Sequence, residues 1–141
     1  MNKFLHFGFK VKDIHESMKT YEALLGIKWD PVREFQTEEQ DLHGKPCSLR
    51  IYLTHGHTAD GTEIEMIQLL DGDVPDRIVL GERDGISHVA YSVDDLEEAR
   101  ARAEGQGLKV VSEGKAGRAN WIFVADDKLG GALVQFVKFN A

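Results

Sequence analysis

The stretches LHFGFKVKD (residues 5–13) and SHVAYSVDD (residues 87–95) decide the fold, because they repeat one pattern. Each contains a histidine, then apolar residues at every second position, then an acidic residue that precedes an amphipathic segment. A repeat of a whole strand-to-helix unit indicates a domain that pairs two similar halves. The repeat also places His6 and His88 at equivalent positions, 82 residues apart.

The first half predicts a strand, a helix and three further strands. We expect a strand over residues 3–11, a helix from Asp13 to about Gly26, and strands over 27–32, 48–54 and 63–70. Asp13 and Glu16 have the spacing of a capping box, and Gly26 is a natural left-handed end for the helix. Residues 37–46 are polar and predict a connection, and residues 55–61 predict a turn. His55 and His57 could bind metal there, but two histidines in a polar turn are expected to be exposed.

The second half predicts the same succession of elements. A strand over residues 87–93 leads to a helix capped by Asp94 or Asp95, and strands follow over 108–112, 121–125 and 132–139. The acidic stretch 71–85, broken by glycine and proline, is the predicted linker. We therefore predict one domain over residues 1–141, with one module at about 1–72 and the other at about 84–141.

Alternation along the two repeated strands predicts where the histidines point. In the first strand Phe7, Phe9 and Val11 form an apolar face suited to packing beneath the helix, which leaves His6 and Gly8 on the other face. The second strand repeats this arrangement, with a small alanine after the histidine. Both histidines are therefore predicted to face away from the helices, each with space beside it.

A second pair of equivalent positions lies near the end of each half. GTEIEMIQL (residues 61–69) and GALVQFVKF (residues 131–139) run in step, which aligns Glu65 with Gln135. A carboxylate between large apolar neighbours needs a partner, because an unpaired buried charge is costly. Two imidazoles, a carboxylate and an amide oxygen suit one divalent ion, with Zn, Co, Ni, Mn and Fe all compatible. Taken singly, each histidine could instead be an ordinary hydrogen-bonded residue of the core or rim.

Composition excludes several classes of protein. Hydrophobic residues make up 42% of the chain and charged residues 29%, and no apolar run is long enough to cross a membrane. The net charge of −7 argues against a nucleic-acid partner, since neutralising phosphates requires a basic surface. A lone Cys47 excludes an internal disulfide, and no signal peptide is evident, so a cytoplasmic location is expected.

The motifs together resemble the vicinal oxygen chelate superfamily, which includes glyoxalase I, methylmalonyl-CoA epimerase, extradiol dioxygenases and antibiotic-resistance proteins. The motifs that carry the resemblance are VKD (11–13), YEALLG (21–26), IEMI (64–67), SHVAY (87–91) and GGALVQ (130–135). The resemblance implies an α+β fold in which two paired βαβββ modules form a curled mixed sheet around a metal-binding cleft. Carried over by position, the metal ligands are His6, Glu65, His88 and Gln135. It also implies a homodimer.

One residue departs from the family pattern. Enzymes of the epimerase and glyoxalase type end this motif in glutamate, where this chain has Gln135. The carboxylate is instead in the first half, so we expect Glu65 to serve as ligand or catalytic base.

The resemblance also implies a reaction. We expect an isomerase, epimerase or lyase that polarises a substrate carbonyl and abstracts the adjacent proton by way of an enolate. The implied partner is a small molecule, either an acyl-CoA thioester or a glutathione hemithioacetal, with the epimerase slightly favoured. The alternatives are lactoylglutathione lyase activity, an extradiol-type dioxygenase, and a non-catalytic binding protein of the resistance type.

Overall fold

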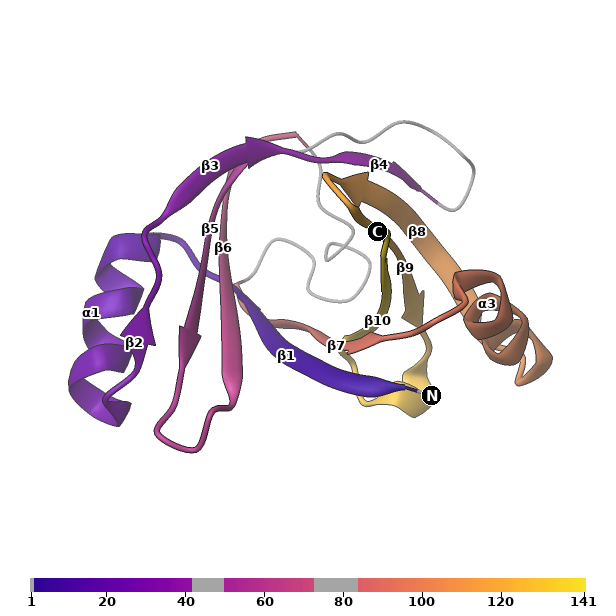
Figure 1. Cartoon of the computed structure of the whole chain (residues 1–141), viewed down its shortest axis with the longest axis horizontal. Helices are drawn as coiled ribbons and strands as arrows, with labels where there is room; N and C mark the ends of the chain where they lie inside the picture. The colour runs from indigo at the N-terminus through magenta and orange to yellow at the C-terminus, as the bar shows by residue number, and fades with distance from the viewer. Residues whose placement is uncertain (1, 42–49, 73–83) are drawn as a thin grey trace.

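The computed structural model describes residues 2–41, 50–72 and 84–141 (Figure 1). The first half of the chain contains β1 (Lys3–Lys10), α1 (Ile14–Leu25), β2 (Lys28–Trp29), β3 (Arg33–Gln36), β4 (Glu38–Asp41), β5 (Arg50–His57) and β6 (Glu63–Asp71). The second half contains β7 (Gly85–Ser92), α3 (Leu96–Gly105), β8 (Lys109–Ala116), β9 (Ala119–Ala125), a short 3-10 turn (Asp127–Leu129) and β10 (Leu133–Phe139). The predicted α+β class with a curled mixed sheet is confirmed. Cys47, the predicted strand start at Ser48 and linker residues 73–83 lie outside the described residues.

Both helices begin at the predicted aspartates. The Asp13 side chain accepts a hydrogen bond from the backbone N–H of Glu16, and Gly26 ends α1 in the left-handed conformation, with φ of 68°. Asp95 caps α3 in the same way by accepting from the N–H of Glu98. Local capping chemistry therefore fixes the start of each helix at the same point of the repeat.

The strands of the described residues form a single sheet built symmetrically about its centre. Their order is β2-β5-β6-β1-β7-β10-β9-β8-β4, with β3 also paired to β5. At the centre, β1 and β7 are antiparallel, and each has a parallel neighbour from its own half, β6 and β10 respectively. Figure 1 shows the sheet as a curl, with α1 and α3 outside it at opposite sides. The boundary between the two predicted modules stays a prediction.

Strands β3 and β4 close the curl, and here the expected polar connection over residues 37–46 was wrong for residues 38–41. β3 pairs with β5 of its own half, whereas β4 pairs with β8 of the other half, with Glu39 opposite Gly114. In Figure 1 these two strands run across the top of the molecule, opposite β1. The segment looks like a loop in sequence because its inward-facing residues, Thr37 and Glu39, are polar although both are buried.

The outer face of β1 differs from the prediction at one residue. Phe9 does lie against the helix, with its ring 6.0 Å from that of Tyr21 on α1. Phe7 does not, since it is 41% exposed, and its ring lies 5.2 Å from that of Phe4. The reason is that α1 packs against β2 and β6, so it covers only one end of β1.

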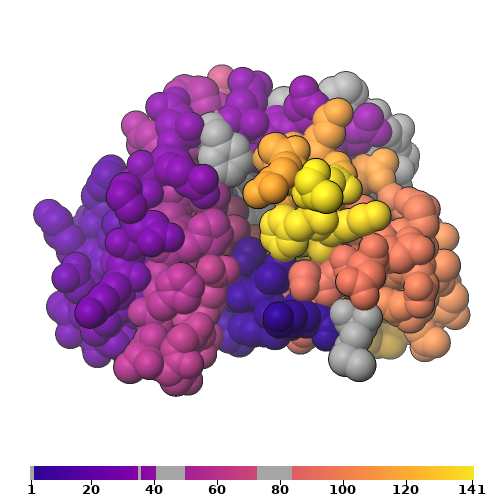
Figure 2. Space-filling model, in the orientation of Figure 1, coloured from indigo at the N-terminus to yellow at the C-terminus, as the bar shows by residue number. Residues whose placement is uncertain are grey.

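The buried apolar residues lie on both faces of the sheet. One cluster (Val111, Trp121, Phe123, Leu133 and Val137) lies inside the curl, and another (Ala103, Ile122 and Val124) lies beneath α3. Figure 2 shows most of the first half, purple to magenta, on the left and most of the second half, orange to yellow, on the right, with purple atoms of the first half also along the top. None of the helices in the described ranges has the length and apolar character required to span a membrane.

Candidate metal centre

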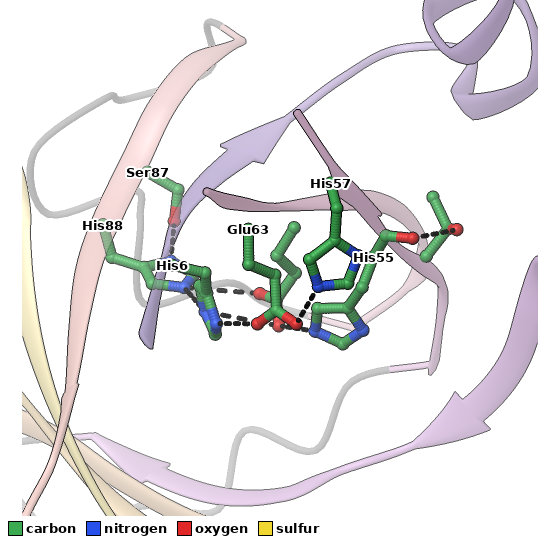
Figure 3. Close-up of polar contacts among 8 residues, drawn as sticks. His6, His55, His57, Glu63, Ser87 and His88 are labelled. Atoms are coloured by element: carbon green, nitrogen blue, oxygen red, sulfur yellow. Dashed lines mark hydrogen bonds and ion pairs between the residues drawn. The ribbon is translucent and has the colours of Figure 1, made fainter. Parts of the chain in front are cut away.

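A buried cluster of His6, Glu65 and His88 lies on the inner face of the sheet. The Nε2 atoms of His6 and His88 are 3.2 Å apart, and the Glu65 carboxylate lies 3.4 Å from the first and 3.3 Å from the second. His6 is 7% exposed and His88 is 1% exposed. Three of the four predicted ligands thus come together in one chain from β1, β6 and β7 (Figure 3).

Strand register explains why the three residues meet. Gly8 of β1 lies directly between Glu65 of β6 and His88 of β7. A Cβ atom at Gly8 would lie 2.2 Å from Cε1 of His88, so only glycine leaves room for this ring. In the neighbouring row, Ala90 lies between His6 and Gln135. The small residues that follow each histidine therefore allow the longer side chains to converge above them.

The spacing of the three donor atoms fits a divalent metal ion. Tetrahedral ligands at about 2.0–2.1 Å from zinc are separated from one another by about 3.4 Å, and the observed separations are 3.2–3.4 Å. The outer nitrogens of both rings also have neighbours, since Nδ1 of His88 lies 2.7 Å from Ser87 Oγ and Nδ1 of His6 lies 3.4 Å from Glu63 Oε2. Such outer contacts keep the proton on Nδ1 and leave Nε2 free to coordinate. The cluster could therefore hold a metal ion.

Gln135 lines the same cavity but does not join the cluster. Its side chain is 8% exposed and makes no hydrogen bond or ion pair with the residues that the structure describes. Its assignment as a ligand stays a prediction.

His55 and His57 were wrongly predicted to lie in a turn, because β5 continues through both. The predicted exposure is confirmed for His57 and is wrong for His55, which lines the cavity. They face Glu65 and Glu63 across the β5–β6 pair, and His55 Nε2 lies 2.9 Å from Glu65 Oε2. His57, by contrast, is about half exposed and contacts Glu63 at 3.2 Å. The alternation that begins at Ile51 and Leu53 continues to His55, and this signal could have revealed that His55 points inward.

The surrounding charges shift the pKa of each group in the cluster. Burial would raise the pKa of Glu65, but His6, His55 and His88 hold it well below its ordinary value. Burial lowers the pKa of His6, and Glu65 offsets this only in part. Burial also acts to lower the pKa of His55, but the hydrogen bond and charge of Glu65 outweigh it and raise that pKa. The Glu65 carboxylate is therefore ionised across the physiological range.

We expect the His55–Glu65 contact to stabilise the metal-free protein in a limited pH window. Because folding raises the pKa of His55, its contribution is complete below the unfolded value of 6.5 and is lost as the pH rises through the folded value. Because folding lowers the pKa of Glu65, its contribution is present above the unfolded value of 4.5 and is lost as the pH falls through the folded value. Urea unfolding of wild type and His55→Ala should differ most between these values. A difference that does not vary with pH would contradict this account.

The cluster lies in the wall of a cavity of about 380 Å³ enclosed by the curled sheet. Most of the lining is apolar: Leu5, Ile51, Leu53, Ile67, Ala116, Ala119, Trp121, Phe123, Val137 and Phe139. The remaining lining residues are polar or charged: His6, Arg33, Thr37, Glu39, His55, Glu63, Glu65, His88 and Gln135. Glu39 reaches the cavity from β4, on the opposite side of the curl from β1, and was not predicted as a site residue.

Solved structures with the same fold include methylmalonyl-CoA epimerases. The hypothetical protein BH1468 from Bacillus halodurans C-125 matches with a TM-score of 0.72 at 21% identity, covering 99% of this chain and 96% of its own. Methylmalonyl-CoA epimerase from Mycobacterium tuberculosis matches with a TM-score of 0.68 at 19% identity, covering 99% and 89%. A variant of the Streptomyces coelicolor epimerase in complex with 2-nitronate-propionyl-CoA matches with a TM-score of 0.62 at 17% identity, covering 100% and 99%.

The comparison with protein-family models assigns the chain to a superfamily. No curated protein sequence matches the chain significantly. The family model described as the glyoxalase/bleomycin resistance protein/dioxygenase superfamily, however, matches residues 5–125. This range includes both repeated strands and three of the four predicted ligands. The chain therefore belongs to the glyoxalase/bleomycin resistance protein/dioxygenase superfamily, as its repeated motifs predicted.

Proposed function

We propose that this protein is a metal-dependent enzyme that moves a proton on the carbon next to a substrate carbonyl. The observation that carries the proposal is the buried cluster of His6, Glu65 and His88, whose donor atoms already converge at the wall of an apolar cavity. A divalent ion held there would polarise a carbonyl oxygen as a Lewis acid. The apolar walls would exclude water and so strengthen each electrostatic interaction inside the cavity.

Glu65 is better suited to hold the ion than to accept the substrate proton. A carboxylate whose pKa lies well below its ordinary value is a weak base, and three imidazoles surround this one. The other carboxylates that line the cavity are Glu63, which contacts His6 and His57, and Glu39. Glu39 is 6% exposed and enters from the opposite side of the curl. We assign Glu39 the role of general base and Glu65 that of ligand.

Glu39→Gln is expected to lower kcat by about 10²–10⁴ while bound metal stays at its wild-type level, because positioned acid–base groups contribute rates of that order. Glu38→Gln is the matched control, since Glu38 is exposed and pairs with Lys115. Turnover and metal content should be measured together. A Glu39→Gln enzyme with wild-type turnover would remove Glu39 from the mechanism.

The substrate that we favour is an anionic thioester. Epimerases with the same fold act on methylmalonyl-CoA or bind an acyl-CoA analogue, and this supports the choice. Arg33 is the only lysine or arginine among the described residues that line the cavity, and it could meet a negative group on the substrate. The glutathione hemithioacetal of methylglyoxal is also anionic and carries an acidic proton on the carbon next to a carbonyl, so it is the second substrate to test.

The proposal is tested by metal analysis followed by proton exchange. Purified protein should contain about one divalent ion per chain, and NMR in deuterated water should show loss of the α-proton signal from a 2-substituted acyl-CoA or from the hemithioacetal of methylglyoxal and glutathione. Exchange should slow by about 10²–10⁴ in the Glu39→Gln variant. Metal-loaded protein that exchanges neither substrate would overturn the proposal.

A dioxygenase is the second candidate, because two histidines and one carboxylate are also the ligand set of non-haem Fe(II) oxygenases. Oxygen consumption by the Fe(II)-loaded protein with a catechol separates the two reactions. Oxygen uptake without proton exchange would favour the dioxygenase.

A further inference from the structure

His55 stands in the same relation to the Glu65 carboxylate as the two predicted histidine ligands. Its Nε2 atom lies 2.9 Å from Glu65 Oε2, and Nε2 is also the atom that His6 and His88 direct at this carboxylate, at 3.4 and 3.3 Å. Three imidazoles thus present the same nitrogen to one carboxylate.

The positions of the imidazole rings also support a ligand role for His55. The centroids of His6 and His55 are 5.6 Å apart, close to the 5.3 Å between His6 and His88. Donor atoms of His6 and His55 also lie within 4.8 Å of each other, in a group with Glu63 that shares only His6 with the group of His6, Glu65 and His88. The register holds His55 in place, because it pairs directly with Glu65 in the β5–β6 ladder.

Gln135 is a weaker candidate for the fourth position. Ala90 of β7 lies between Gln135 of β10 and His6 of β1 in the sheet. The Gln135 side chain makes no hydrogen bond or ion pair with the described residues. An amide oxygen is also a poorer donor than an imidazole for zinc, nickel or iron. The His55 side chain, by contrast, is 22% exposed and lines the cavity, so an entering ion can reach its ring.

We propose that His55 is a ligand of the divalent ion, which is then held by three imidazoles and one carboxylate: His6, His55, His88 and Glu65. Gln135 is left to face the substrate, where its amide can donate and accept hydrogen bonds. Amide and imidazole are both neutral, so the charge of the site does not change. This inference rests on the proposed metal site and extends it by naming a ligand that the repeat does not contain.

The competing role for His55 is that of a positioning residue that donates its Nε2 proton to Glu65. The two roles differ in the proton at Nε2, which a ligand lacks and a donor keeps. Long-range ¹H–¹⁵N NMR of the zinc-loaded protein reads this directly. We expect His55 to carry its proton on Nδ1; a proton on Nε2 in the zinc-loaded protein would overturn the proposal.

Zinc affinities of three variants give an independent test. His55→Ala should weaken zinc binding by more than about a hundredfold, beyond the range found for residues that only support a ligand. Gln135→Ala should weaken it less, and His57→Ala, the half-exposed neighbour, should leave it unchanged. The NMR spectrum of the zinc-free His55→Ala protein checks that the sheet is intact, and His55→Gln, which keeps a donor for Glu65, provides a second variant.

The possible outcomes separate this inference from the proposed function. If wild type binds zinc and Gln135→Ala abolishes binding whereas His55→Ala does not, His55 is not a ligand and the ligand set predicted from the repeat is correct. If His55→Gln restores wild-type affinity, the side chain acts through Glu65 and the inference fails. If wild type binds no divalent ion at all, the metal-dependent function fails as well.

Discussion

Replacing Gly8 with alanine is expected to push the His88 ring out of the cluster and to abolish tight metal binding. The added Cβ would lie 2.2 Å from Cε1 and 2.5 Å from Nε2 of His88, distances at which the ring must move. His88 is 1% exposed and packs edge-on against Phe123, so it has little space to move into. Overpacking of this kind also destabilises a fold by about 1–3 kcal/mol.

Metal content and thermal unfolding of the Gly8→Ala protein would show both effects. Gly105→Ala is the matched control, because a Cβ there meets nothing within 4 Å and the residue lies at the end of a helix, where alanine is favourable. The control should bind metal normally and be at least as stable as wild type. Normal metal affinity in Gly8→Ala would mean that His88 does not coordinate from its present position.

Replacing Glu65 with glutamine is expected to cost more metal affinity than any other single change of a charged residue in the cavity. The carboxylate is the one negative group within 3.5 Å of both His6 and His88 among the described residues. Its loss leaves the ion with neutral ligands only, so we expect affinity to fall by well over about a hundredfold. A chelator competition assay measures the change, and turnover should fall with it.

Glu63→Gln provides the comparison, because Glu63 contacts the outer nitrogen of His6 rather than the inner one. A residue that only orients a ligand changes affinity by about 10–100-fold, so this variant should fall between wild type and Glu65→Gln. Equal losses in the two variants would show that Glu63 binds the ion itself. Intact turnover in Glu65→Gln would reject Glu65 as both ligand and base.

The repeat and the strand alternation predicted the centre of the cluster. In each copy a small residue lies two positions after the histidine, and this pattern predicts that His6 and His88 lie on the inner face. Glu65 could be predicted because a charge between Ile64 and Met66 requires a buried partner. These inferences rest on alternation along single strands, that is, on residues two positions apart in the sequence, so no knowledge of strand pairing is required.

The parts that sequence could not predict depend on contacts between distant segments. The pairing of β4 with β8 joins residues more than 70 positions apart. The polar sequence of β4 contains no signal that β8 is its partner. Phe7 belongs to an apolar alternation, yet it stays exposed because α1 covers only one end of β1. His55 was predicted in a turn because polar residues and glycine surround it, although the sheet continues through them.

The central pairing of β1 with β7 sets the order in which this protein can fold. His6 and His88 are 82 residues apart in sequence, so the two strands cannot meet until most of the chain is available. Contacts of such long range slow folding, because the entropy of closing a long loop is lost before the contacts form. The candidate metal ligands are therefore assembled only in the late steps of folding, and a newly made first half would pair β1 with β6 but would have no complete cluster.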